Sequence, residues 1–164
     1  NTICGDNIMI SLLILCATIV SLFLLLLLIF AIEDKKFEKE WAKKEEIRKN
    51  AECRLTDSLK MMCSLLDIDL SYHKELGTAA GRILYLSMAG RLFVDDARIE
   101  ILEKYENDPY VLAHELGHYM AIKQRQDNSE EGADSEAEKL CRLILNQQEQ
   151  ELLKIALHCY FGKG

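Results

Sequence analysis

Residues 108–123 read DPYVLAHELGHYMAIK, and this stretch predicts the helix around which the rest of the domain is arranged. Asp108 is a strong helix N-cap, and Pro109 suits the first helical position because its φ angle is already helical. The apolar residues that follow are spaced at i, i+4, i+7 and i+8: Leu112, Leu116, Tyr119 and Met120. The pattern predicts a helix that runs to about Lys123 and buries one face.

Two histidines lie one turn apart on this helix. His114 and His118 project from nearly the same angular position, so their imidazoles can share a metal ion. Glu115 stands where its carboxylate can reach a metal-bound water, which is the general-base position of the HExxH zinc proteases. The competing interpretation is an amphipathic helix with solvated histidines. Gly117 counts against it: glycine costs about 1 kcal/mol in a helix interior, so we expect another element to pack against it.

A third zinc ligand is needed, because catalytic zinc takes three protein ligands and keeps one position open. Three acidic residues follow His118 closely, and Ser129 predicts a helix N-cap just before them. On that helix Glu130 and Asp134 share a face, whereas Glu131 points about 100° away. The longer side chain favours Glu130 as the ligand and leaves Asp134 to orient a ligand histidine. The alternative is an acidic helix N-terminus that complements the helix dipole.

The remaining pattern predicts an α+β domain over residues 51–164. It is mostly helical and zincin-like, with a small antiparallel hairpin that turns between Ser87 and Gly90. The segment 97–107 is ambiguous between a short helix and a strand followed by a loop. Helical apolar stripes are predicted before and after the hairpin, at Leu55, Leu59, Met62 and Leu66, at Ala133, Ala137, Leu140, Cys141 and Ile144, and at Leu152, Ile155, Ala156 and Cys159.

An uncharged apolar stretch precedes this domain. Residues 8–32 carry no charge and predict one transmembrane helix that contacts membrane lipid, with 33–50 as a charged juxtamembrane helix or linker. A signal peptide is the alternative, but the N-terminal flank has no basic residue. Eight basic side chains lie between Lys35 and Arg54, so the positive-inside rule predicts that residues 1–7 lie outside and that the catalytic domain is cytoplasmic.

Charge and cysteine content exclude other classes of protein. The net charge of −7 argues against a nucleic-acid-binding protein, which needs a basic surface. The six cysteines form no CxxC pair, which fits neither a disulfide framework nor a zinc ribbon. We expect them to be reduced thiols.

The string AHELGH at Ala113–His118, together with ExxAD at Glu130–Asp134, resembles the ImmA/IrrE family of zinc metallopeptidases over roughly residues 81–144. The resemblance implies that His114, His118 and Glu130 bind Zn²⁺ and that Glu115 is the base. It also implies a substrate that is a protein, often a regulator. The loop between His118 and Glu130 is shorter than that family leads one to expect, and a membrane anchor is not usual there.

The predicted function is therefore zinc-assisted hydrolysis of peptide bonds in a cytoplasmic or membrane-proximal protein. Tyr110, Tyr119 and His73 are candidates for stabilising the oxyanion, each with a structural role as the alternative. The strand Arg91–Asp95 is a candidate for pairing with an extended substrate. The alternative function is a non-catalytic structural or interaction protein, part of a membrane or phage-related assembly, that retains the fold.

Overall fold

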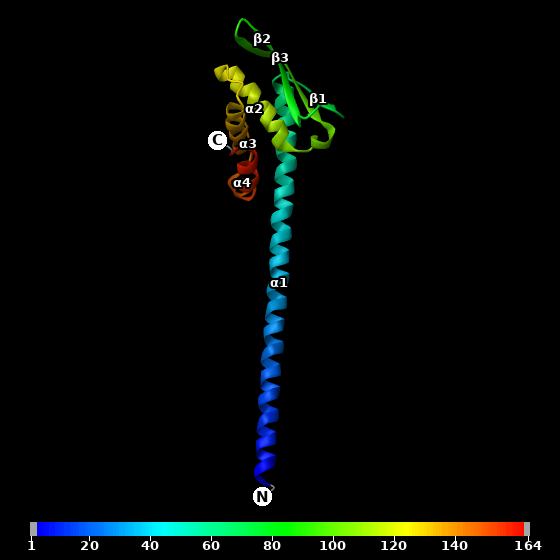
Figure 1. Ribbon diagram of the computed structural model, residues 1–164, viewed down its shortest axis with the longest axis vertical. Coiled ribbons are helices and arrows are strands. Elements are labelled where there is room, and N and C mark those ends of the chain that lie inside the picture. The colour runs from blue at the N-terminus through cyan, green and yellow to red at the C-terminus, as the bar shows by residue number, and fades with distance from the viewer. Residues whose placement is uncertain (1–2, 163–164) are drawn as a thin grey trace. The chain divides into compact units, whose positions relative to one another are not determined.

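The computed structural model describes residues 3–162, and of residues 3–14, 16 and 17 it describes the backbone only. The chain divides into two compact units, Asn1–Glu45 and Glu46–Gly164. Helix α1, Ile3–Leu65, forms the described part of the first unit and opens the second (Figure 1). The predicted boundary between linker and domain, at residues 50 and 51, therefore lies within one continuous helix.

The predicted transmembrane helix over residues 8–32 is wrong by the structure. Among the residues described, no helix has both the length and the apolar character needed to cross a membrane. The single-pass topology predicted from this span is withdrawn with it.

The second unit is α+β and contains a three-stranded sheet with three helices after it. Three elements match the sequence prediction closely: the hairpin, the helix that carries both histidines, and the helix that follows Ser129. The segment 97–107 is resolved as the end of a strand and a 3₁₀ turn. In chain order after α1 the elements are β1 (Asp69–His73), β2 (Gly81–Met88), β3 (Arg91–Leu102), the 3₁₀ helix Glu103–Tyr105, α2 (Pro109–Arg125), α3 (Glu130–Ile144) and α4 (Gln147–Phe161).

The sheet is mixed, with strand order β1-β3-β2. β2 and β3 form the predicted antiparallel hairpin, and Ala89 and Gly90 turn it with positive φ angles. β1 pairs in parallel with β3, from Asp69 opposite Arg98 to His73 opposite Leu102. The prediction of a purely antiparallel hairpin or sheet missed β1, because five residues with two apolar side chains are too few for a period-two pattern to stand out.

The hydrophobic core joins the last turns of α1 to the sheet and to the three later helices. The buried apolar residues at this end of α1 are Ala51, Leu55, Leu59 and Cys63, at a regular spacing of four. Met62 and Leu66, which were predicted to belong to this stripe, are only partly buried, and Cys63 is buried in their place. Each fully buried leucine contributes about 1.5–3 kcal/mol, so this end of α1 is an integral part of the folded unit.

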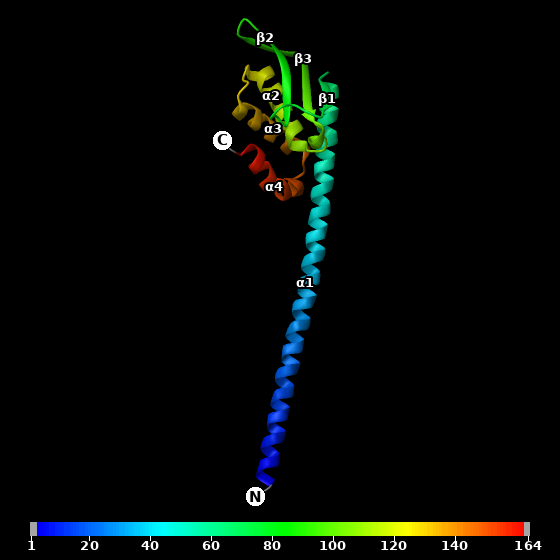
Figure 2. The ribbon, with the colours of Figure 1, turned by 45° about the vertical axis from the view of Figure 1, so that its right-hand side comes forward.

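α2 contacts both the sheet and α3, and α3 in turn contacts α4 (Figure 2). The apolar stripe predicted for α2 is buried at Leu112, Leu116 and Tyr119. The helix that carries the two histidines therefore has a strand on one side and an acidic helix on the other, and these neighbours surround the candidate site.

Candidate metal centre and its pocket

The start of α2 is set by the residues predicted to cap it. The Asp108 carboxylate accepts a hydrogen bond from the Tyr110 N–H at 2.9 Å, and Pro109 occupies the first turn. Because the helix is regular from there, His114 and His118 lie one above the other, with ring centroids 4.8 Å apart and ring planes nearly perpendicular. Both imidazoles face the same side of α2, as their spacing predicts.

α3 approaches this side of α2 because Gly117 has no side chain. A Cβ atom at Gly117 would lie 2.2 Å from the carbonyl oxygen of Ala133 and 3.1 Å from the amide nitrogen of Ala137. The expectation that another element packs against this glycine is confirmed. Ser129 caps α3 through a 3.0 Å bond from the Gly132 N–H, so Glu130 is its first helical residue.

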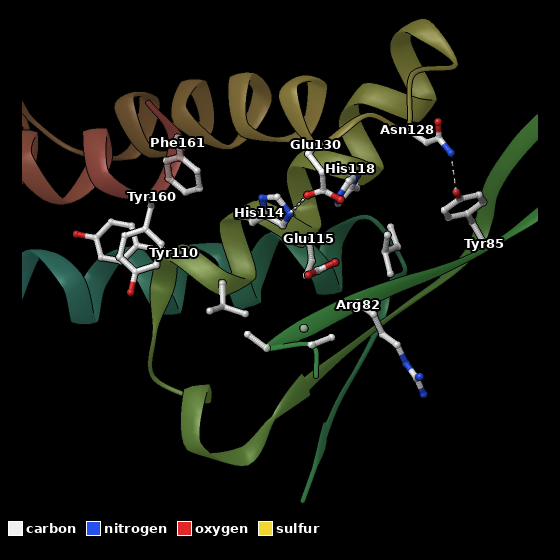
Figure 3. Close-up of a pocket in the computed structure, with 15 residues that line it drawn as sticks. Arg82, Tyr85, Tyr110, His114, Glu115, His118, Asn128, Glu130, Tyr160 and Phe161 are labelled. Atoms are coloured by element: carbon white, nitrogen blue, oxygen red, sulfur yellow. Dashed lines mark hydrogen bonds and ion pairs between the residues drawn. The ribbon is translucent and has the colours of Figure 1, made fainter. Parts of the chain in front are cut away.

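The close packing of α2 and α3 brings three side chains together. In the part of the chain that the structure describes, His114, His118 and Glu130 form a group whose ligand atoms all lie within 4.8 Å of one another (Figure 3). One Glu130 oxygen lies 3.0 Å from Nε2 of His114, and the other lies 3.6 Å from Nε2 of His118. Two imidazoles and one carboxylate are a donor set that zinc takes in hydrolytic enzymes.

Asp134 contacts the same histidine from its other ring nitrogen. Its carboxylate lies 2.8 Å from Nδ1 of His114, one turn along α3 from Glu130. Glu131, by contrast, is exposed and lies outside the group that Glu130 belongs to. As the helical geometry predicts, Glu130 and Asp134 both face the histidines, whereas Glu131 is exposed to solvent.

Glu115 is buried, with 5% of its surface exposed, and its carboxylate faces the pocket beside the two histidines (Figure 3). Burial raises the pKa of the Glu115 carboxyl from 4.5 to about 7, and the charge of Glu130 adds to the rise. The charge on His114 and a hydrogen bond from the Ile83 backbone lower it in part. Burial, and then the charge on His114, lower the pKa of His118, which favours the neutral imidazole that metals bind.

The pocket in front of these residues has a volume of about 520 Å³ and lies between β2, α2 and the end of α4. The cluster of His114, His118 and Glu130 is in its middle (Figure 3). At one end Asn128 donates a hydrogen bond to the Tyr85 hydroxyl at 3.2 Å, and at the other the rings of Tyr110, Tyr160 and Phe161 gather (Figure 3). The site is thus an elongated groove with a polar end and an aromatic end.

Of the three oxyanion candidates, only Tyr110 lines this pocket. Tyr119 is buried in the core, and its hydroxyl accepts a hydrogen bond from Lys123 at 2.8 Å. His73 is at the end of β1, where it contacts Ser71 and Glu100 instead. Tyr119 and His73 therefore lie outside this pocket.

The strand along the groove is β2, so the expectation that Arg91–Asp95 would pair with substrate is corrected. Residues 91–95 of β3 lie outside the pocket, whereas Gly81, Ile83 and Tyr85 of β2 line it. A Cβ atom at Gly81 would lie only 2.9 Å from a Glu115 carboxylate oxygen, so glycine allows the strand to approach the base closely. The side chain of Arg82 points away from the histidines and pairs with Glu100.

Sequence reasoning missed the residues at both ends of the groove. Tyr85 and Asn128 come from β2 and from the loop before α3, and Tyr160 and Phe161 from the end of α4. None of them belongs to a spacing motif. The one feature that sets the last two apart is a pair of consecutive aromatic residues at the end of an apolar helical pattern.

No family model, no curated protein and no solved structure matches this chain. The class of site is accordingly defined by its own geometry: two histidines one turn apart, a carboxylate from a second helix, and a buried glutamate in one groove.

Proposed function

We propose that this protein is a zinc-dependent metallopeptidase that hydrolyses peptide bonds in a protein substrate. The observation that carries the proposal is the convergence of His114, His118 and Glu130 beside the buried Glu115, in a groove open to solvent. An HExxH spacing also arises by chance in unrelated helices. A third ligand that a separate helix brings close to both histidines arises by chance much more rarely, so it is stronger support for a metal site.

The residues present fit a zinc ion. His114 Nε2, His118 Nε2 and one Glu130 oxygen are close enough to bind one ion together, and Glu130 is 78% exposed and free to adjust. A zinc ion held there would supply Lewis acidity and would bring the pKa of a coordinated water to near 7. Asp134, on Nδ1 of His114, holds that ring in the orientation and tautomer that direct Nε2 toward the ion.

Glu115 is the proposed general base. Its carboxylate is not a member of the ligand group, yet it faces the same groove, so it can take a proton from the attacking water and pass it to the leaving amine. The Ile83 N–H holds the carboxylate from the side of β2. A base of this kind typically contributes about 10²–10⁴-fold to the rate.

The groove suits an extended peptide. β2 is at one edge of the sheet, and its residues line the groove over several positions, so a substrate strand can add to the edge. The resemblance to ImmA/IrrE metallopeptidases in the AHELGH and ExxAD strings supports a folded or partly unfolded protein, such as a regulator, as the source of that strand.

The deciding experiment compares the wild-type protein with Glu115→Gln. We expect one zinc per chain in both by elemental analysis, together with the same thermal unfolding temperature. Hydrolysis of a denatured protein substrate should fall by at least about 10²-fold in the variant. His114→Ala should lose both the zinc and the activity.

A matched control is Glu131→Gln, which makes the same chemical change on an exposed residue outside the ligand group. It should keep full activity. Loss of zinc from Glu115→Gln would show that this residue ligates the metal and does not serve as the base. Equal turnover by Glu115→Gln and wild type would refute the proposed chemistry.

A further inference from the structure

The aromatic end of the groove is built from two helices that lie far apart in the sequence. Tyr110 is in the first turn of α2, and Tyr160 and Phe161 end α4. Tyr110 stacks on Tyr160 with ring centroids 4.5 Å apart and planes 16° from parallel, and Phe161 lies 6.2 Å from both rings. We call these three residues the aromatic wall.

The aromatic wall is held firmly relative to the helix of the metal centre. The Tyr160 hydroxyl donates a hydrogen bond to Asp108 at 3.2 Å, and the other oxygen of the same carboxylate caps α2. Tyr110 and Phe161 are each only 5% exposed, whereas Tyr160 is 46% exposed. The wall therefore presents mainly the Tyr160 ring to the groove on a rigid backing.

We propose that the aromatic wall is a specificity subsite that receives a bulky apolar side chain of the bound peptide. The inference rests on the proposed peptidase function and names a class of substrate for it. It follows from continuity: the wall lines the same pocket as His114 and Glu115, so a peptide that occupies the metal centre extends along it. Aromatic surface favours apolar and aromatic side chains over acidic ones.

The two ends of the groove differ in chemistry, which makes the subsite selective along the peptide. At the opposite end the Asn128 amide and the Tyr85 hydroxyl are polar and hydrogen-bonded to each other. A large apolar side chain of the peptide is therefore favoured at the aromatic wall, and this contact sets the register of the peptide relative to His114 and Glu115.

The test measures binding separately from hydrolysis. Zinc-loaded Glu115→Gln protein is titrated with short fluorescein-labelled peptides of alanine that carry one phenylalanine, moved stepwise along the peptide, and with the all-alanine peptide. Fluorescence anisotropy should show that the best phenylalanine peptide binds at least about tenfold more tightly, the usual effect of one apolar pocket.

Two substitutions at Tyr160 and one control assign this preference to the wall. Tyr160→Ala, added to the Glu115→Gln protein, should reduce the preference to less than about threefold, and Tyr160→Lys should reverse it toward a peptide with glutamate in that place. Phe93→Ala removes an aromatic ring that is 42% exposed and lies outside the pocket, so it should leave the preference intact. Circular dichroism establishes that each variant is folded.

The outcomes separate the subsite from the reaction. A phenylalanine preference that survives both Tyr160→Ala and Tyr160→Lys, or no preference at all, would overturn the subsite. If the wild-type protein cleaves peptides whatever their apolar content, the peptidase function is supported and the subsite is refuted. If the phenylalanine peptide binds more tightly but the wild-type protein cleaves no peptide, the subsite is supported and the peptidase function is refuted.

Discussion

His114 uses its two ring nitrogens for different carboxylates. Nε2 faces Glu130 at 3.0 Å and Nδ1 faces Asp134 at 2.8 Å. When Nδ1–H donates to Asp134, the lone pair on Nε2 is free for a metal ion. Glu130 and Asp134 therefore contact different nitrogens of the same ring, so substitutions can distinguish the roles proposed for them.

We predict that Glu130→Ala loses most of the bound zinc, because it removes one of the three ligand atoms. Asp134→Ala should retain zinc with an affinity weakened by roughly 10- to 100-fold, since it removes only the partner that orients His114. Competition with a fluorescent zinc chelator measures both affinities.

Glu131→Ala is the matched control for this pair, because it deletes an adjacent carboxylate on the same turn of α3 that faces solvent. Its zinc affinity should equal that of the wild type. A full site in Glu130→Ala together with an empty one in Asp134→Ala would require the two roles to be exchanged.

At the scale of elements, the distance between α2 and α3 depends on the absence of one Cβ atom. Helix propensity alone predicts that Gly117→Ala stabilises α2 by about 1 kcal/mol. The added Cβ would instead meet the Ala133 carbonyl oxygen at 2.2 Å, which is backbone and cannot rotate away. The two helices must separate to admit it.

We predict that Gly117→Ala lowers the free energy of unfolding by at least about 1–3 kcal/mol, the usual cost of overpacking, and weakens zinc binding because Glu130 moves with α3. Urea unfolding and zinc titration measure the two effects. Gln124→Ala, at an exposed position of the same helix, is the control and should change stability by less than about 0.5 kcal/mol. A Gly117→Ala protein that is more stable than wild type would contradict the prediction, because it would show that α2 and α3 have room for the added Cβ atom.

The hairpin is attached to α2 at two places, and both keep β2 beside the groove. The Ile83 backbone hydrogen-bonds to Glu115. At the far end of α2, the Gln126 side chain accepts a bond from the Leu92 N–H at 2.8 Å and donates one to the Leu92 carbonyl oxygen at 3.1 Å. These contacts explain how a short hairpin holds a defined position along the helix of the metal centre.

At the scale of the whole molecule, the buried core belongs to the second compact unit. Among the residues described, every buried hydrophobic side chain lies between Ala51 and Phe161, and the described large apolar side chains of residues 15–41 are exposed. Burial of apolar surface is the main source of folding free energy, so the second unit contains what it needs to fold.

We therefore predict that a protein limited to residues 46–164 folds cooperatively and binds one zinc with the affinity of the full chain. Thermal unfolding by circular dichroism and a zinc titration test this. A second truncation that starts at residue 60 is the contrasting variant, because it removes Ala51, Leu55 and Leu59 from the core and should fail to fold. Failure of the longer protein to fold would show that the first unit contributes to stability.

Local patterns in the sequence determined the parts of this protein that depend on near neighbours. The four-residue spacing of His114 and His118 places both on one face of any helix, and the caps at Asp108 and Ser129 begin the two helices where predicted. Gly117, inside a predicted helix, also predicted that another element packs closely against it, and this element is α3. The membrane helix was a prediction of the same local kind, and the structure does not support it.

Only the tertiary structure decided which distant segments complete the groove. β1 joined the sheet in parallel, β2 became the edge strand beside Glu115, and the end of α4 brought Tyr160 against Tyr110. These contacts join residues separated by tens of positions, so no periodic pattern in the sequence predicts them. They follow from how the elements bury their apolar faces together. Spacing could therefore predict that His114 and His118 share one face of a helix, but it could not predict the walls of the groove.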